Sequence, residues 1–186
     1  MYCYNFKIIL FMQGSEIMLY IDFDGVILDT DKILFEKWEK NPVSHLLPES
    51  EKIKYIQNSN WNYVLNNSAI INDSVYYLKQ MNPKNSFILT KIHSTANEGY
   101  EKVRWIRSQG IKQSVILVPY LLRKSDMVSA EGNILIDDCL KNLDDWTNNK
   151  GIGILFDIND DNYDSWNQPN TKGYEKVLSL SNFKNY

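Results

Sequence analysis

The stretch Leu19–Val26 constrains the fold of this chain more than any other. It reads Leu-Tyr-Ile-Asp-Phe-Asp-Gly-Val, an apolar and β-rich run that ends in two aspartates one residue apart and a glycine. In parallel α/β sheets ligands gather at the carboxyl ends of the strands, so this strand would deliver acidic side chains to a binding site. Asp22 and Asp24 would share a face if extension continues. Gly25 then permits a turn that a residue with a Cβ would resist.

Composition limits the classes of protein to which the chain can belong. Its 186 residues are 44% hydrophobic and 23% charged, which suits one compact domain with a modest insertion. The net charge is −3 without a large block of one sign, so no nucleic-acid polymer is expected as a partner. Cys3 and Cys139 have neither the spacing of a disulfide framework nor that of a metal site. We therefore expect a reduced protein located in the cytoplasm.

The N-terminal segment 7–12 is apolar but much shorter than the ~20 residues of a membrane-spanning helix. It also lacks the full core and the cleavage site of a signal peptide, so no membrane partner is expected. Met18 directly precedes the first strand. We expect residues 1–17 to be a disordered or loosely docked leader, such as an upstream start codon would add. An added edge strand is the alternative interpretation.

Strand-like and helix-like segments alternate along most of the remaining chain. Short apolar runs predict strands, and helical spacing of apolar residues predicts helices between them. The predicted strands are 86–90, 114–118, 133–138 and 152–156, and the predicted helices are 96–109, a segment from 140 to about 150, and 174–180. Near-continuous apolar strands separated by helices predict a parallel sheet covered on both faces. The expected fold class is α/β, a Rossmann-like parallel sheet of about five strands flanked by helices.

The segment between the first two strands contains no convincing strand. Its helical spacings predict four helices, at 32–40, from 49 onward, at 60–67 and at 73–81, and Asp31 is the expected N-cap of the first. We expect a core domain of 18–30 and 83–186 with a small helical insertion at 31–82.

Three predicted strands end in chemically functional side chains, and a cation lies between the last two in sequence. The groups are Asp22 and Asp24, then Thr90, then Lys124 within Arg-Lys-Ser-Asp, then Asp137 and Asp138. The series acid pair, hydroxyl, lysine, acid pair resembles the four motifs of the haloacid dehalogenase (HAD) superfamily, which consists mostly of phosphohydrolases that work through an aspartyl-phosphate. The resemblance covers about residues 18–157.

The first acid pair fits other kinds of acidic site less well. Short acidic pairs also occur in calcium loops and in solvated turns, but an EF-hand would need a third acid or amide before the glycine and a distal glutamate. Phosphate-receiver domains use similar groups in a different order along the chain.

The resemblance implies a role for each group. Asp22 would attack phosphorus in line. Asp24 would protonate the leaving oxygen and later take a proton from water. Thr90 would donate a hydrogen bond to a phosphoryl oxygen, and Lys124 would pair with the nucleophile and the transferring phosphoryl group. Lys91, next to Thr90, is the alternative for the cationic role or for a substrate contact, unless it is simply solvated.

A divalent cation is expected because a phosphate dianion would otherwise approach four carboxylates. At ~4 Å and an effective dielectric constant of ~20, each pair of unit charges is worth about 4 kcal/mol. Hard oxygen ligands favour Mg²⁺. The resemblance implies that the ligands are the Asp22 carboxylate, the backbone carbonyl of Asp24, and Asp137 and Asp138. One acid of the last pair would bind directly and the other through water, in either order.

The helical insertion resembles the C1-type cap of the superfamily. Its size, together with segments 135–142 and 151–156, looks most like the 5′(3′)-deoxyribonucleotidase branch, which dephosphorylates nucleoside monophosphates and stacks the base on cap aromatics. Phe35, Trp38 and Trp61, with Tyr63 as a further aromatic, are the candidate substrate-binding residues, and Trp61 is favoured because it lies in the least regular part of the insertion. Aromatic residues at helical spacing are equally typical of a cap core.

The expected function is a Mg²⁺-dependent phosphomonoester hydrolase, namely a 5′-nucleotidase acting on deoxyribonucleoside monophosphates. The partner would be a small-molecule phosphomonoester, and the protein a monomer or homodimer. Two alternatives stay open: a phosphatase for another small phosphoester such as a sugar phosphate, and a phosphate- or nucleotide-binding module without turnover.

Overall fold

The structure is a computed structural model that describes residues 16–40, 42–157 and 173–186. Most of the predicted leader, residues 1–15, therefore lies outside the described residues. In the described part of the chain, no helix has both the length and the apolar character needed to cross a bilayer.

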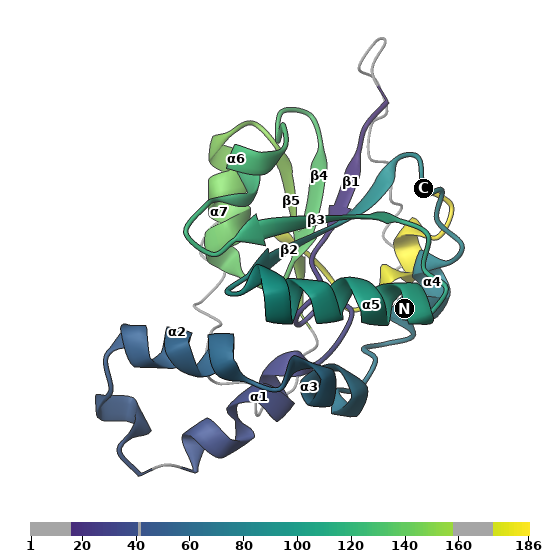
Figure 1. The fold of residues 1–186 in the computed structure, drawn as a ribbon. Coiled ribbons are helices and arrows are strands. Elements are labelled where there is room, and N and C mark those ends of the chain that lie inside the picture. The colour runs from purple at the N-terminus through teal and green to yellow at the C-terminus, as the bar shows by residue number, and fades with distance from the viewer. Residues whose placement is uncertain (1–15, 41, 158–172) are drawn as a thin grey trace, which may run out of the picture.

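Six parallel strands form a single sheet in the order β3-β2-β1-β4-β5-β6 (Figure 1). The strands are β1 (Leu19–Ile21), β2 (Ser86–Ile92), β3 (Ser114–Pro119), β4 (Ile134–Asp137), β5 (Ile152–Phe156) and β6 (Glu175–Val177). The predicted parallel α/β class is confirmed, with one strand more than expected. Strand β1 lies between β2 and β4. Its carboxyl end is therefore close to Thr90 in β2 and to Asp137 and Asp138 at the end of β4.

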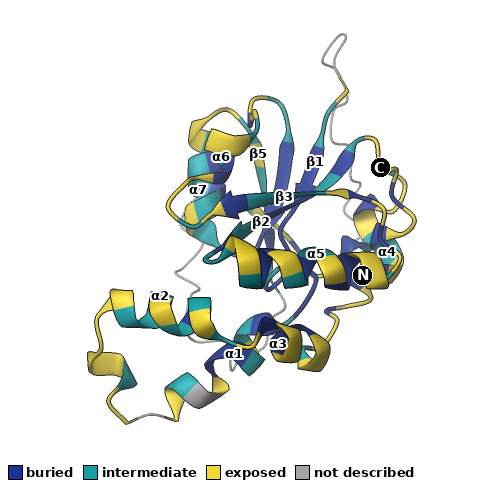
Figure 2. Ribbon diagram, in the orientation of Figure 1, coloured by how far each residue is buried: buried dark blue, intermediate teal, exposed yellow. Residues whose placement is uncertain are grey.

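Helices cover both faces of the sheet. Leu19 and Ile21 of β1 belong to a buried cluster with Trp105 and Ile106 of α5 (Tyr100–Ser108). Tyr20 points to the opposite face, as alternation along a strand requires, and lies 5.3 Å from the Trp146 ring of α7 (Leu140–Asn148). The short helix α6 (Lys124–Met127) packs beside α7. Figure 2 shows the strands of the sheet mostly buried and the helices exposed on one side.

The segment between β1 and β2 is helical, as predicted. It contains α1 (Thr30–Glu39), a 3₁₀ turn at Ser44–Leu46, α2 (Glu49–Asn58), α3 (Trp61–Asn67) and α4 (Ser74–Leu78). Helices α1, α2 and α3 lie together at one end of the sheet (Figure 1). The first helix begins at Thr30, two residues earlier than predicted, with Asp29 in the N-cap position. Asp31 is thus a residue of the first turn and not the cap.

The two connections of this helical insertion to the sheet lie side by side. Leu28 and Ile70 form an antiparallel bridge. The Asp29 amide donates to the Ala69 carbonyl at 3.0 Å, and the Ile71 amide donates to the Ile27 carbonyl at 3.1 Å. Helices α1, α2 and α3 are therefore joined to the rest of the fold through two adjacent backbone segments, and α4 follows before the chain enters β2.

The predicted helix at 174–180 is wrong. This segment forms the edge strand β6, followed by a 3₁₀ helix, η3 (Leu180–Phe183). Val177 is buried while Glu175 and Lys176 are exposed, and the Asp157 amide donates to the Val177 carbonyl at 3.0 Å. Pairing with β5 overrides the weak helical spacing of the segment, as tertiary context commonly does.

Candidate active site

Strand register brings the first and last acid pairs together. Ile21 is the register partner of Ile136 in β4, and the Asp22 amide donates to the Ile136 carbonyl at 2.9 Å. Asp22 therefore lies beside Asp137, at the carboxyl edge of the central strands. The sequence predicted this juxtaposition because parallel strands end at the same edge of a sheet.

Asp22, Asp137 and Asp138 form an acidic cluster. Each offers a carboxylate oxygen, and the three oxygens all lie within 4.8 Å of one another. Burial, opposed by Lys124 and reinforced by Asp137 and Asp24, raises the pKa of Asp22 to about 7. Burial together with Asp137 and Asp22 holds the pKa of Asp138 well above its ordinary value. Three close, poorly solvated carboxylate oxygens fit a hard divalent cation such as Mg²⁺.

Lys124 lies between the two acid pairs. Its side chain is 1% exposed, and its Nζ is 2.8 Å from Asp22 Oδ1 and 2.6 Å from Asp137 Oδ2. Burial acts to lower the pKa of Lys124, but the carboxylates of Asp137 and Asp22 outweigh burial and raise the pKa above its ordinary value. Lys124 is therefore a fixed positive charge next to the predicted nucleophile. Lys91, the alternative, is not among the ion-pair partners of Asp22 in the described residues.

The two acids of the last pair have different surroundings. Asp137 accepts hydrogen bonds from Lys124, from the Cys139 amide at 2.9 Å and from the Asn142 side chain at 3.1 Å. Asp138 lies against Gly25, where an added Cβ would be 2.2 Å from its Oδ2, and the φ of +71° at Gly25 also favours glycine. Asp137 is thus fixed by protein donors, whereas the Asp138 carboxylate faces the turn after β1.

Asp24 points to a different set of partners from Asp22. Thr30 donates to Asp24 Oδ1 at 2.7 Å, and Thr90 donates to Asp24 Oδ2 at 3.4 Å. The Nζ of Lys102 lies 2.5 Å from Asp24 Oδ2. The predicted hydroxyl, Thr90, therefore lies next to the predicted proton donor at the end of the sheet.

Sequence reasoning missed Lys102. Within the predicted helix at 96–109, Tyr100 is 61% exposed whereas Lys102 is fully buried. The segment Thr95–Gly99 is a π-helical turn, in which the Gly99 amide donates to the Ser94 carbonyl at 2.9 Å. The extra residue in this turn rotates the following side chains. The sequence does contain one indication of this burial. Glu98 and Lys102 are four residues apart and share a helical face with the apolar Trp105 and Ile106.

Two of the predicted substrate-binding aromatics are buried. Trp61 is 2% exposed and its indole N–H donates to the Ile56 carbonyl at 3.0 Å. Phe35 is 7% exposed, and the Lys52 Nζ lies 4.4 Å from its ring centroid. Both rings belong to the apolar core, so a stacking role does not fit these positions.

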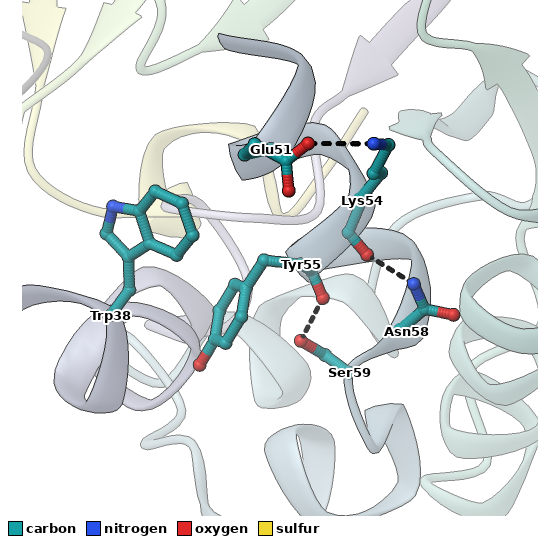
Figure 3. Close-up of a pocket in the computed structure, with 6 residues that line it drawn as sticks. All are labelled: Trp38, Glu51, Lys54, Tyr55, Asn58 and Ser59. Atoms are coloured by element: carbon teal, nitrogen blue, oxygen red, sulfur yellow. Dashed lines mark hydrogen bonds and ion pairs between the residues drawn. The ribbon is translucent and has the colours of Figure 1, made fainter. Parts of the chain in front are cut away.

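Trp38 lies beside an open pocket of about 450 Å³ between α1 and α2. Figure 3 shows its ring facing that of Tyr55, and the two ring centroids are 5.1 Å apart. The other lining residues are Glu51, Lys54, Asn58 and Ser59, none of them an acid of the cluster. Trp38 therefore lies next to open space, and Tyr63, the other predicted aromatic, is 55% exposed.

Comparison with known proteins finds similar structures but no similar sequences. No model of a protein family matches the sequence, and no curated protein matches it. Among solved structures, β-phosphoglucomutase from Clostridium difficile matches with a TM-score of 0.53 and 14% identity over 90% of this chain and 93% of that chain. A putative HAD-hydrolase from Bacillus subtilis, YfnB, bound to magnesium, matches with a TM-score of 0.53 and 13% identity over 91% and 97%. A HAD phosphatase from Thermococcus onnurineus gives 0.51 and 11% over 89% and 94%.

The chain has a HAD-like fold. Identities of 11% to 14% establish the fold, whereas the reaction has to be argued from the site.

Proposed function

We propose that this protein is a phosphomonoester hydrolase that uses Mg²⁺ and forms an aspartyl-phosphate on Asp22. The observation that supports this most directly is the ion pair of buried Lys124 with Asp22 at 2.8 Å, inside a cluster of three carboxylates. A nucleophilic carboxylate needs a neighbouring positive charge because the incoming phosphoryl group is negative. The HAD fold supports the same reaction class by analogy.

The acidic cluster is the proposed metal site. Asp22 and Asp138 would bind Mg²⁺ directly, together with the backbone carbonyl of Asp24, and Asp137 would act through water while it holds Lys124. This order follows from the hydrogen bonds that already occupy the Asp137 carboxylate. When bound, Mg²⁺ would neutralise the carboxylates and polarise the phosphoryl oxygens.

The proposed reaction has two steps, and each side chain of the site has a role in them. Asp22 Oδ attacks phosphorus while the bond to the leaving oxygen breaks, and Asp24 gives that oxygen a proton. Asp24 then takes a proton from the water that attacks the phosphorus of the aspartyl-phosphate, while the bond from Asp22 to phosphorus breaks, the Asp22 carboxylate re-forms and inorganic phosphate leaves. Thr90 and Lys124 would donate hydrogen bonds to phosphoryl oxygens during both steps.

The substrate class that we propose is a deoxyribonucleoside monophosphate, on the strength of the sequence resemblance to the 5′(3′)-deoxyribonucleotidase branch. Trp38 and its pocket would be the place to look for a base contact. A sugar phosphate or another small phosphoester is the competing substrate. The panel of compounds described below tests both possibilities. We propose a cytoplasmic location, because Cys3 and Cys139 lack the spacing of a disulfide framework.

The test is release of phosphate from deoxy- and ribonucleoside 5′- and 3′-monophosphates and from sugar phosphates, with Mg²⁺ or with EDTA. We expect release with Mg²⁺ and a fall of at least about 10³-fold in Asp22→Asn, because the nucleophile is lost. Acid quenching should trap phosphate on a peptide that contains Asp22. Glu131→Gln, which changes an exposed acid, is the matched control and should retain activity.

Each outcome of the panel is decisive for one part of the proposal. Activity limited to sugar phosphates would retain the mechanism and exclude the nucleotidase. Full activity of Asp22→Asn would exclude the mechanism. Mg²⁺ binding without turnover of any compound would indicate a binding module.

A further inference from the structure

Lys102 is a fully buried cation whose ammonium group contacts four oxygen atoms. Its Nζ lies 2.5 Å from Asp24 Oδ2, 2.8 Å from Glu98 Oε1, 3.1 Å from the Lys91 carbonyl and 3.3 Å from Thr90 Oγ1. Two of these partners, Asp24 and Thr90, belong to the proposed reaction machinery. Burying a lysine is costly unless it is paired, so the pairing with Asp24 and Glu98 is what allows a cation at this position.

The surroundings of Lys102 strengthen its electrostatic contacts. Its Nζ is 5.0 Å from the Trp61 ring of α3 and 5.5 Å from the Phe23 ring. These rings exclude water, and a low local dielectric constant strengthens an ion pair. Burial acts to lower the pKa of Lys102, but Asp24 and Glu98 outweigh burial and raise the pKa above its ordinary value. Lys102 therefore stays positively charged.

Glu98 fixes the ammonium group from the opposite side. Its Oε1 binds Lys102, and its Oε2 accepts the His93 amide at 2.6 Å. Glu98 is 1% exposed and lies in the π-helical turn before α5. The position of Lys102 is thus set by the backbone after β2 and not by Asp24 alone.

The two oxygens of Asp24 are held differently. Oδ2 is bound by Lys102 and Thr90, whereas Oδ1 accepts, from the part of the chain that the structure describes, one hydrogen bond, donated by the rotatable hydroxyl of Thr30. A hydroxyl can reverse from donor to acceptor when a carboxyl group becomes protonated, but an ammonium group cannot. Oδ1 is therefore the oxygen that can carry and release a proton.

We propose that Lys102 is a positioning residue for Asp24, which it holds by Oδ2 so that Oδ1 faces the leaving group of the substrate. This inference rests on the proposed phosphohydrolase function and assigns a residue that the sequence motifs do not contain. In the first step the proton on Oδ1 passes to the leaving oxygen as its bond to phosphorus breaks and the Asp22–phosphorus bond forms. Lys102 then pairs with the carboxylate that remains.

The experiment compares kcat/KM for phosphate esters whose leaving groups differ in their need for a proton. This ratio reports steps up to the transfer of phosphate to Asp22, so later hydrolysis of the intermediate does not enter it. In Lys102→Met we expect about 10²-fold loss for an alkyl phosphate, in line with the contribution of general acid catalysis. For 2,4-dinitrophenyl phosphate, whose leaving group needs no proton, we expect less than about threefold loss.

Three further variants complete the comparison. Asp24→Asn removes the proposed proton donor, so its kcat/KM values for the two esters show how large the difference between leaving groups becomes without that group. Arg104→Met removes an exposed cation from the same helix, paired with Glu101 at 2.7 Å, and should leave both esters unaffected. Lys102→Met/Glu98→Gln removes one charge of each sign, so it avoids an unpaired buried carboxylate next to α5 if the single variant does not fold.

An equal loss for both esters in a folded Lys102 variant would overturn the inference, because a structural defect does not discriminate between leaving groups. Failure of both Lys102 variants to fold would also overturn it and make Lys102 a structural residue. A wild-type protein that hydrolyses no ester contradicts the proposed function itself. Ester hydrolysis that is lost in Asp22→Asn but independent of Lys102 contradicts the positioning role alone.

Discussion

Asp22 and Asp24 are separated by one residue, yet each pairs with its own buried lysine. Asp22 pairs with Lys124 at the start of α6, and Asp24 pairs with Lys102 on α5. Helices α5 and α6 lie on opposite sides of the sheet. The two acids of one motif thus have separate electrostatic environments, as their proposed roles of nucleophile and proton donor require.

The sequence could predict one of these pairings but not the other. Lys124 is one of the residues that resemble the HAD motifs, and it lies in the sequence between Thr90 and the second acid pair. Lys102 stands in a helix whose register depends on a π-helical turn at Thr95–Gly99. Such a turn gives little signal in one sequence, because the spacing of apolar residues changes by only one position.

Asp31 provides a prediction about pH at the residue scale. Burial and the nearby Asp24 raise the pKa of Asp31 to about 6, opposed by Lys52 and Lys102. Between pH 4 and 6 the folded state then binds more protons than the unfolded state, so the free energy of unfolding falls as pH rises. Without Mg²⁺, Asp31→Asn should raise the free energy of unfolding by about 1–2 kcal/mol at pH 7, with a much smaller effect at pH 4. Urea unfolding at the two pH values measures the difference.

The control for this experiment is Asp73→Asn, an exposed aspartate in the same helical insertion. It should have little effect at either pH. An increase of the same size at pH 4 and pH 7 in Asp31→Asn would contradict the assignment to the Asp31 carboxyl group.

At the scale of elements, the C-terminal segment is part of the core and not an appendage. Phe183 of η3 is 3% exposed, and the hydroxyl of Tyr186 donates to the Ile17 carbonyl at 3.0 Å. Predicting a helix here failed because helical spacing in a short polar segment is weaker than strand pairing with β5. The predicted helices of the insertion, by contrast, form where apolar residues recur on one side, as in α2 and α3.

Phe183→Ala should lower the free energy of unfolding by about 3–5 kcal/mol, because it removes a buried aromatic side chain. Urea unfolding followed by circular dichroism measures the change. Leu178→Ala is the matched control, since Leu178 is 52% exposed, and should change the free energy by less than about 0.5 kcal/mol. Equal effects of the two substitutions would show that η3 does not pack on the sheet in solution.

At the scale of the whole molecule, the strand order explains why the site was predictable. A parallel sheet with β1 at its centre brings the ends of β1, β2 and β4 to one edge, whichever helices connect them. Asp22, Thr90 and Asp137 need only end or follow their strands to meet there. The position of the aromatic residues depends instead on how α1, α2 and α3 pack, which side-chain spacing alone does not determine.

Mg²⁺ should stabilise the whole molecule if the acidic cluster binds it. At a concentration 100 times the dissociation constant the gain is about 2.7 kcal/mol, which would raise Tm by roughly 5–10 °C. Differential scanning fluorimetry with Mg²⁺ and with EDTA measures the shift. Asp138→Asn should abolish most of it, whereas Glu131→Gln should retain it. A shift that survives in Asp138→Asn would place the ion elsewhere.

The pairing of Leu28 with Ile70 has a consequence for how this chain can change. Every residue between them is attached to the sheet through two adjacent backbone segments, so the intervening helices can lengthen, shorten or be exchanged without altering strand order. Under the proposed function, changes in these helices away from Thr30 and Trp61 would alter selectivity for the leaving group while Asp22 and Lys124 stay where they are. In evolutionary terms, the proposed reaction and its selectivity would then be encoded in largely separate stretches of one gene.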